Sequence, residues 1–108
     1  MAPAMPKVED VFNALGDPTR RAIVRRLARG PSTVSDLAEP LSITLTGVRQ
    51  HLDVLEACGL VRTEKVGRAR MCTFEPKGLV VIEAWINVQR SIWERALDDL
   101  RDLLDEGD

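Results

Sequence analysis

Cysteine, histidine and aromatic residues are scarce in this chain of 108 residues, which contains two Cys, one His and 4% aromatic residues. Two cysteines are too few for a disulfide framework, and Cys58 and Cys72 lack the spacing of a metal-binding motif. No apolar run approaches the roughly 20 residues of a membrane span, and residues 1–7 lack the hydrophobic stretch of a signal peptide. We therefore expect one domain over residues 1–108, located in the cytoplasm, with residues 1–7 flexible.

The same scarcity argues against an enzyme. Catalysis needs a nucleophile with a base, or an acid and a base in a cleft. A single His and the lack of a Gly-rich phosphate-binding loop provide little for either arrangement. A binding protein is the favoured class.

The net charge of −2 hides a segregation of charge along the chain. Residues 18–77 contain eleven Lys and Arg against six Asp and Glu, whereas residues 78–108 contain three against eight. A local basic surface attracts phosphates even when the whole chain is acidic. Residues 18–77 are therefore the candidate for contact with nucleic acid.

Residues 33–58 have the pattern of a short helix, a tight turn and a second amphipathic helix. Thr44 is the expected N-cap of the second helix. A helical repeat of about 100° per residue then predicts one buried face, formed by Leu45, Val48, Leu52 and Leu55. The opposite face is small and polar and consists of Thr46, Gly47, Gln50 and Asp53, flanked by Arg49. This is the layout of a helix-turn-helix that reads DNA.

The polar face carries residues suited to DNA contacts. Gln50 can bond an adenine edge through two hydrogen bonds, and Arg49 can reach a guanine or a phosphate. Thr46 can bond a phosphate or touch a thymine methyl group. Gly47 costs about 1 kcal/mol relative to Ala inside a helix, which a close approach of DNA to the backbone would explain. For any one of these residues taken alone, a solvated surface position is the favoured interpretation.

Two helices are expected before this motif. The first, over residues 8–15, places Val8, Val11, Phe12 and Leu15 on one side. The second begins at Asp17-Pro18, a capping carboxylate followed by proline at the first helical position, and runs to residue 29. It is expected to bury Ile23, Val24, Leu27 and Ala28. We expect the guanidinium group of Arg20 to meet a carboxylate.

The period of the pattern changes after the helix-turn-helix, where residues 60–75 are predicted to form a β-hairpin. Two strands, 60–65 and 70–75, are joined at residues 66–69, where Gly67 supplies the special dihedral. The tip is basic and carries Arg62, Lys65, Arg68 and Arg70. A basic β-wing beside a helix-turn-helix would lie over a flanking minor groove or its phosphates.

A long last helix is predicted over residues 79–104, with an apolar face too broad for one small domain to cover. The expected cover is the same helix and the N-terminal helix of a second copy, which gives a two-fold dimer. The predicted interface includes Val11, Phe12, Trp85, Gln89, Trp93 and Leu100.

Three segments, 14–21 (ALGDPTRR), 37–38 and 48–61 (VRQHLDVLEACGLV), are similar to the ArsR family of bacterial winged-helix transcriptional regulators. The resemblance covers residues 8–104. It implies a mainly α fold of four helices, a β-hairpin and a fifth helix that dimerises through its first and last helices. It also implies a repressor that binds a palindromic DNA operator, commonly that of its own operon, through Thr44, Thr46, Gly47, Arg49, Gln50, Arg68 and Arg70.

The chain departs from the metal sensors of that family. Residues 34–38 (VSDLA) occupy the place of the Cys-x-Cys motif, and the last helix lacks His, with only Asp98, Asp99, Asp102, Asp105 and Glu106 as candidate ligands. Carboxylates alone bind hard cations weakly unless they converge. We expect no cofactor, with a divalent metal as the less favoured alternative.

The single His and the two Cys each have an ordinary and a functional interpretation. His51 lies at the edge of the buried face, where packing or a phosphate contact is favoured over metal ligation. Cys58 and Cys72 are expected to be small buried residues, although a thiol switch between them is an alternative.

Two other functions remain open at this point. One is a nickel- or zinc-responsive regulator with an atypical site, and the other is a winged-helix module that binds a protein. A small molecule or a protein could serve as effector in any of these cases.

Overall fold

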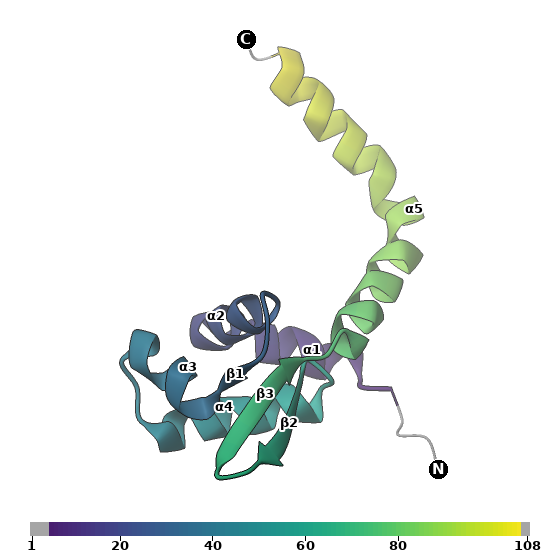
Figure 1. Cartoon of the computed structure of the whole chain (residues 1–108). Coiled ribbons are helices and arrows are strands. Elements are labelled where there is room, and N and C mark those ends of the chain that lie inside the picture. The colour runs from purple at the N-terminus through teal and green to yellow at the C-terminus, as the bar shows by residue number, and fades with distance from the viewer. Residues whose placement is uncertain (1–4, 107–108) are drawn as a thin grey trace.

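A computed structural model describes residues 5–106. Within these residues, four short helices and a three-stranded sheet form a body from which a long last helix projects (Figure 1). In chain order the elements are α1 (Val8–Leu15), α2 (Pro18–Leu27), β1 (Ser32–Thr33), α3 (Val34–Leu41), α4 (Leu45–Ala57), β2 (Val61–Val66), β3 (Ala69–Phe74) and α5 (Lys77–Glu106). The predicted winged helix-turn-helix is confirmed. Residues 1–7 were expected to be flexible, and four of them, residues 1–4, lie outside the described residues.

Side-chain caps fix where three of the helices begin. The Asp17 carboxylate accepts a hydrogen bond from the Arg20 backbone N–H at 3.0 Å, which lowers the pKa of Asp17 from 3.8. Thr33 accepts in the same way from the N–H of Asp36 at 3.1 Å and opens α3. The Thr44 hydroxyl accepts from the N–H of Gly47 at 3.0 Å and opens α4, as predicted. These bonds satisfy N–H groups that a helix leaves unpaired in its first turn.

The sheet is antiparallel with strand order β1-β3-β2, so β2 lies at an edge. Each strand lies one residue nearer the turn than predicted, because Val66 pairs with Ala69 and leaves only Gly67 and Arg68 in the turn. Gly67 has a φ of 62°, the left-handed value expected of it. Strand β1 was not predicted, since its two residues are too short to show a strand period.

The core lies where α4 meets the other elements of the body. Its largest fully buried side chains are Val11, Ile23, Leu27, Leu37, Val48, Leu55, Leu60, Val61 and Cys72. Two predicted core residues are exposed instead. Leu45, 52% exposed, stands in the first turn of α4, at the outer end of the helix. Ala28 is the C-cap of α2 and faces outward.

The junction between α4 and β2 is a compact Schellman turn. The N–H of Leu60 donates to the Leu55 carbonyl at 2.9 Å, and the N–H of Gly59 donates to the Glu56 carbonyl at 3.1 Å. Gly59 has a φ of 73°, which a residue with a side chain rarely adopts. Leu55 and Leu60 are both fully buried, so the turn also joins the end of α4 to the core.

Helix α5 starts against this turn and then leaves the body. The N–H of Gly78 donates to the Gly59 carbonyl at 2.8 Å, and residues 90–106 are all exposed. The radius of gyration is 17.5 Å, against about 13 Å for a compact domain of this length. Among the described residues, no helix is long and apolar enough to cross a membrane.

The close approach at Gly78 yields a stability prediction. A Cβ atom on this residue would lie 2.7 Å from the Cys58 carbonyl oxygen and 2.8 Å from Cδ2 of Leu60. Gly78→Ala should therefore lower the free energy of unfolding by about 1–3 kcal/mol, as overpacking does. Urea denaturation measures this. The control Asn87→Ala, at an exposed position of α5, should change it by less than about 0.5 kcal/mol.

Candidate nucleic-acid interface

Helix α4 presents the polar face that the sequence predicted. Val48, Leu52 and Leu55 are buried against the body, whereas Thr46, Arg49, Gln50 and Asp53 are exposed. Thr44 is exposed as well, although its hydroxyl is already engaged as the N-cap. The face therefore offers hydrogen-bond donors and acceptors over the first two and a half turns of the helix.

Gly47 has a local reason that the sequence did not reveal. A Cβ atom at this position would lie 3.2 Å from the capping hydroxyl oxygen of Thr44. The atom that approaches the backbone of residue 47 within the chain is thus the N-cap. The Thr44 cap therefore accounts for glycine at position 47 without a DNA contact. DNA can still approach the helix at the same place.

A basic hollow lies between α4 and the wing. A cavity of about 210 Å³ is lined by Arg49 of α4 together with Lys65, Arg68, Ala69 and Arg70 of the hairpin. An adjoining hollow is lined by Arg49, Leu52, Asp53, Thr63 and Arg70. The fold thus brings Arg49 and Arg70, which are 21 positions apart, to one concave surface. Four cations around one hollow attract phosphate groups.

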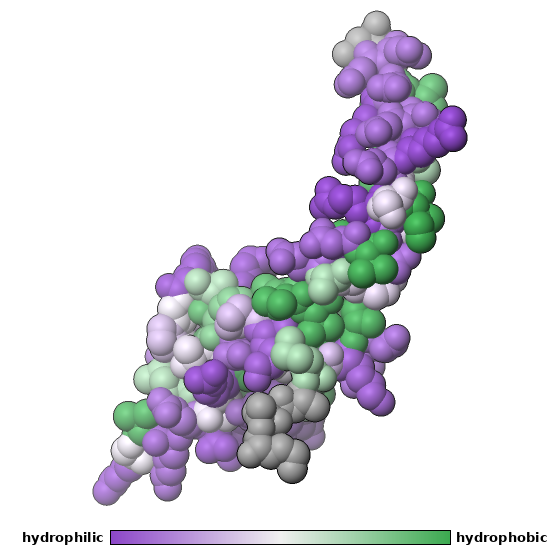
Figure 2. Space-filling view, turned by 90° about the vertical axis from the view of Figure 1, so that its right-hand side faces the viewer, coloured by the Kyte–Doolittle hydropathy of each residue, from purple (hydrophilic) through white to green (hydrophobic). Residues whose placement is uncertain are grey.

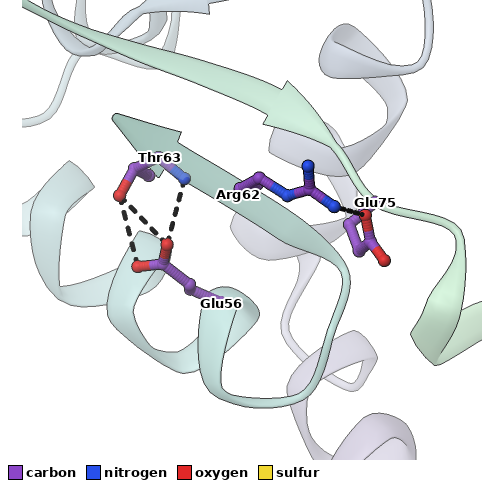
Figure 3. Close-up of polar contacts among 4 residues, drawn as sticks. All are labelled: Glu56, Arg62, Thr63 and Glu75. Carbon is purple, nitrogen blue, oxygen red and sulfur yellow. Dashed lines mark hydrogen bonds and ion pairs between the residues drawn. The ribbon is translucent and has the colours of Figure 1, made fainter. Parts of the chain in front are cut away.

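Arg62 does not belong to this basic surface. Its guanidinium donates to the Glu75 carboxylate at 2.9 Å, at the base of the wing (Figure 3). The sequence had placed Arg62 with the cations of the wing tip. That assignment is wrong because β2 carries Arg62 next to the end of β3, where a carboxylate neutralises it.

A second contact in Figure 3 joins α4 to the wing. Oε1 of Glu56 accepts from the Thr63 backbone N–H at 3.0 Å, and both carboxylate oxygens lie 3.2 Å from the Thr63 hydroxyl. Sequence reasoning missed this contact. The two residues are seven positions apart across a turn, and no helix or strand period relates them.

The Arg20 side chain is held by carbonyl groups, and the expectation of a carboxylate partner is wrong. Its Nε donates to the Ala14 carbonyl at 2.7 Å, and its Nη2 lies 3.4 Å from the Asn13 carbonyl oxygen. Its Nη1 lies 3.4 Å from Nδ1 of His51, which belongs to α4. Arg20 therefore joins the end of α1 to α4, because carbonyl groups in the last turn of a helix lack the usual partner four residues on and can accept from a side chain. His51 takes part in this contact through a polar interaction of its ring nitrogen.

The two thiols lie in the core. Cys58 and Cys72 are free and buried, and this burial raises the pKa of each thiol above 9.0. A raised pKa disfavours the thiolate, which is the reactive form. Both residues therefore fit the interpretation as small buried side chains. Among residues 5–106, no three His, Cys, Asp or Glu side chains are grouped closely enough to hold a metal ion.

The residues predicted for a dimer interface lie along α1 and α5. Phe12, Trp85 and Trp93 form a chain of edge-on ring contacts, with centroids 5.3 Å and 5.4 Å apart. Trp93 remains 41% exposed, and Leu100 is exposed beyond it. Val11 is different, since it is fully buried within the chain and has no surface left for a second copy. Its assignment to the interface is therefore corrected.

Known proteins share both the sequence and the fold of this chain. A helix-turn-helix domain model matches residues 15–64. The HTH-type transcriptional regulator Rv2034 of Mycobacterium tuberculosis is 41% identical over 98 residues, which cover 90% of this chain and 89% of that protein. The transcriptional repressor SdpR of Bacillus subtilis is 33% identical over 61 residues, which cover 56% of this chain and 68% of that protein.

Among solved structures, that of the ArsR family transcriptional regulator RHA00566 superimposes with a TM-score of 0.76 at 42% identity, covering 83% of this chain and 97% of that one. These relatives are regulators of transcription and not enzymes. Their agreement with the helix-turn-helix and wing described above identifies a DNA-binding regulator. The chain belongs to the ArsR family of winged helix-turn-helix transcriptional regulators.

Proposed function

We propose that this regulator binds a palindromic operator as a homodimer and represses transcription, including that of its own operon. The observation that carries the proposal is the basic hollow, where Arg49 of α4, the proposed recognition helix, lies beside Lys65, Arg68 and Arg70 of the wing. Such a surface can engage a groove and its flanking phosphates together. The repressing outcome is supported by the similarity to SdpR, which is a transcriptional repressor.

Helix α4 is proposed to enter the major groove with Thr44, Thr46, Gly47, Arg49 and Gln50. Gln50 reads an adenine edge, since its amide matches the donor and acceptor of that base. Arg49 reads a guanine or holds a phosphate. Thr44 and Thr46 lie in the first turn, where the free N–H groups of a helix also favour a phosphate. Base recognition therefore resides in α4.

The wing is proposed to hold the DNA backbone on one side of that groove. Arg68 occupies the turn itself, and Arg70 is the second residue of β3. Both side chains are exposed and can reach phosphates of the adjacent minor groove. Contacts of this kind set position and affinity and carry little sequence information.

The dimer is proposed to form through the apolar side of α5 and the adjoining part of α1. Figure 2 shows hydrophobic residues gathered where α5 leaves the body and continuing in patches along the helix. The exposed members of this apolar side include Phe12, Ile86, Ile92, Trp93, Leu97, Leu100, Leu103 and Leu104. Large apolar side chains exposed together on one side of a helix mark an interaction surface. A two-fold axis through it would place the two α4 helices about one turn of DNA apart.

The division of roles between helix and wing yields a prediction about specificity. Gln50→Ala should weaken binding to a duplex selected by the protein from random DNA by about 1–3 kcal/mol, with less effect on unselected DNA. Arg68→Ala should weaken binding to both DNAs alike, because it removes a phosphate contact. Fluorescence anisotropy on the two duplexes measures this. Parallel losses for both variants on both duplexes would contradict the assignment.

The proposed dimer yields a prediction about assembly. Trp93→Asp would bury a carboxylate in the interface and should convert the dimer to monomers or make the protein insoluble. The control is Arg95→Asp, at an exposed position about 200° around the helix from Trp93, which should remain dimeric. Light scattering at micromolar concentration reports the mass. A monomeric wild-type protein would refute the dimer.

A further inference from the structure

The placement of the wing depends on few contacts because β2 is an edge strand. Its inner side pairs with β3, and its outer side faces no other strand of residues 5–106. The wing tip, Gly67 and Arg68, lies at the far end of this hairpin. The outer edge of β2 presents backbone N–H and C=O groups that only another element of the fold can bind.

The Glu56 carboxylate holds that edge. It accepts a hydrogen bond from the Thr63 backbone N–H, which points to the free side of β2, and it also contacts the Thr63 hydroxyl. Hydrogen bonds to an ionised carboxylate are stronger than neutral ones. Glu56 itself is fixed in the last turn of α4 by the Schellman turn, in which its own carbonyl accepts from the N–H of Gly59. The carboxylate thus links the recognition helix directly to the wing.

The link lies where a small rotation has a large effect. Arg68 lies five positions after Thr63, of which three run along β2 to Val66 and span about 10 Å, and the turn follows. A rotation of about 15° at Thr63 would move the tip by about 3 Å, given that length. This displacement of the tip is as large as the donor–acceptor distance of a hydrogen bond between an arginine and a phosphate, about 2.8 Å. A wing that rocks by this amount loses its phosphate contact while α4 remains in its groove.

We propose that Glu56 is a positioning residue that sets the wing relative to α4, so that Arg68 reaches its phosphate only while the Glu56–Thr63 contact is intact. This inference rests on the proposed function. It assigns a role to a residue that carries the wrong charge for DNA binding. As a mere negative charge, Glu56 would weaken DNA binding and its removal would strengthen it. As a positioning residue, its removal weakens binding.

The test is a double-mutant cycle with Glu56→Ala and Arg68→Ala, measured by anisotropy on the duplex that the wild-type protein selects from random DNA. Each single variant should lose about fivefold in affinity, and the double variant should lose no more than about twofold beyond Glu56→Ala alone. The physical reason is that a displaced tip no longer contacts the phosphate. Glu56→Gln should recover most of the affinity, because its amide oxygen can still accept from the Thr63 N–H.

The matched control is Glu64→Ala, which removes a carboxylate from an exposed position of the same strand. It should leave affinity unchanged or raise it. Circular dichroism establishes that Glu56→Ala is folded. If it is not, Thr63→Val replaces it in the cycle, since this change removes only the hydroxyl contacts and should reduce the Arg68→Ala effect in the same direction.

Two results would overturn the inference while leaving the proposed function intact. One is a double variant whose loss is the product of the two single losses, about 25-fold, which means no coupling. The other is a Glu56→Ala variant that binds more tightly, as Glu64→Ala does. A wild-type protein that selects no duplex would refute the proposed function itself, and the inference with it.

Discussion

The burial of one side of α4 is the constraint on which the rest of the structure depends. Val48, Leu52 and Leu55 anchor this helix among α2, α3 and the sheet, so the opposite side must face solvent. Burial of three such side chains contributes several kcal/mol, at about 1.5–3 kcal/mol each. That energy fixes the rotation of the helix about its axis. The exposure of Arg49 and Gln50 follows from this packing and not from any property of their own.

The end of α4 determines the rest of the interface. A Schellman turn at Gly59 directs the chain into β2, and Glu56 then fixes β2 against the helix that precedes it. The first turn of α5 packs against the same turn through Gly78. One junction therefore carries the recognition helix, the wing and the proposed dimerisation helix.

Local signals made much of the fold predictable. Asp17-Pro18 and Thr44 are caps whose chemistry is complete within four residues, and the hairpin turn depends on Gly67 alone. The predictions fail where contacts between distant segments determine whether a residue is buried or belongs to a strand. Leu45 has the helical phase of a core residue, but it lies in the outermost turn of α4 and is exposed. Strand β1 exists only because Ser32 and Thr33 meet β3.

In the candidate site, too, features that follow from a local repeat were predictable and contacts between distant segments were not. The polar face of α4 follows from a helical period, so it was predictable from sequence, and so was a basic hairpin. The carbonyl partners of Arg20 and the Glu56–Thr63 contact were not, since they join segments whose spacing follows no repeat. Arg62 shows the opposite case, a cation that sequence groups with the tip and the fold pairs with Glu75.

The salt dependence of operator affinity tests the central claim most directly, namely that cations of α4 and the wing bind phosphates in both copies of a dimer. Arg49, Arg68 and Arg70 in each copy would make about six phosphate contacts, so a plot of log K against log salt concentration should have a slope of about −5 or steeper. This result is expected between about 50 and 200 mM salt. A slope near zero over that range would contradict the account.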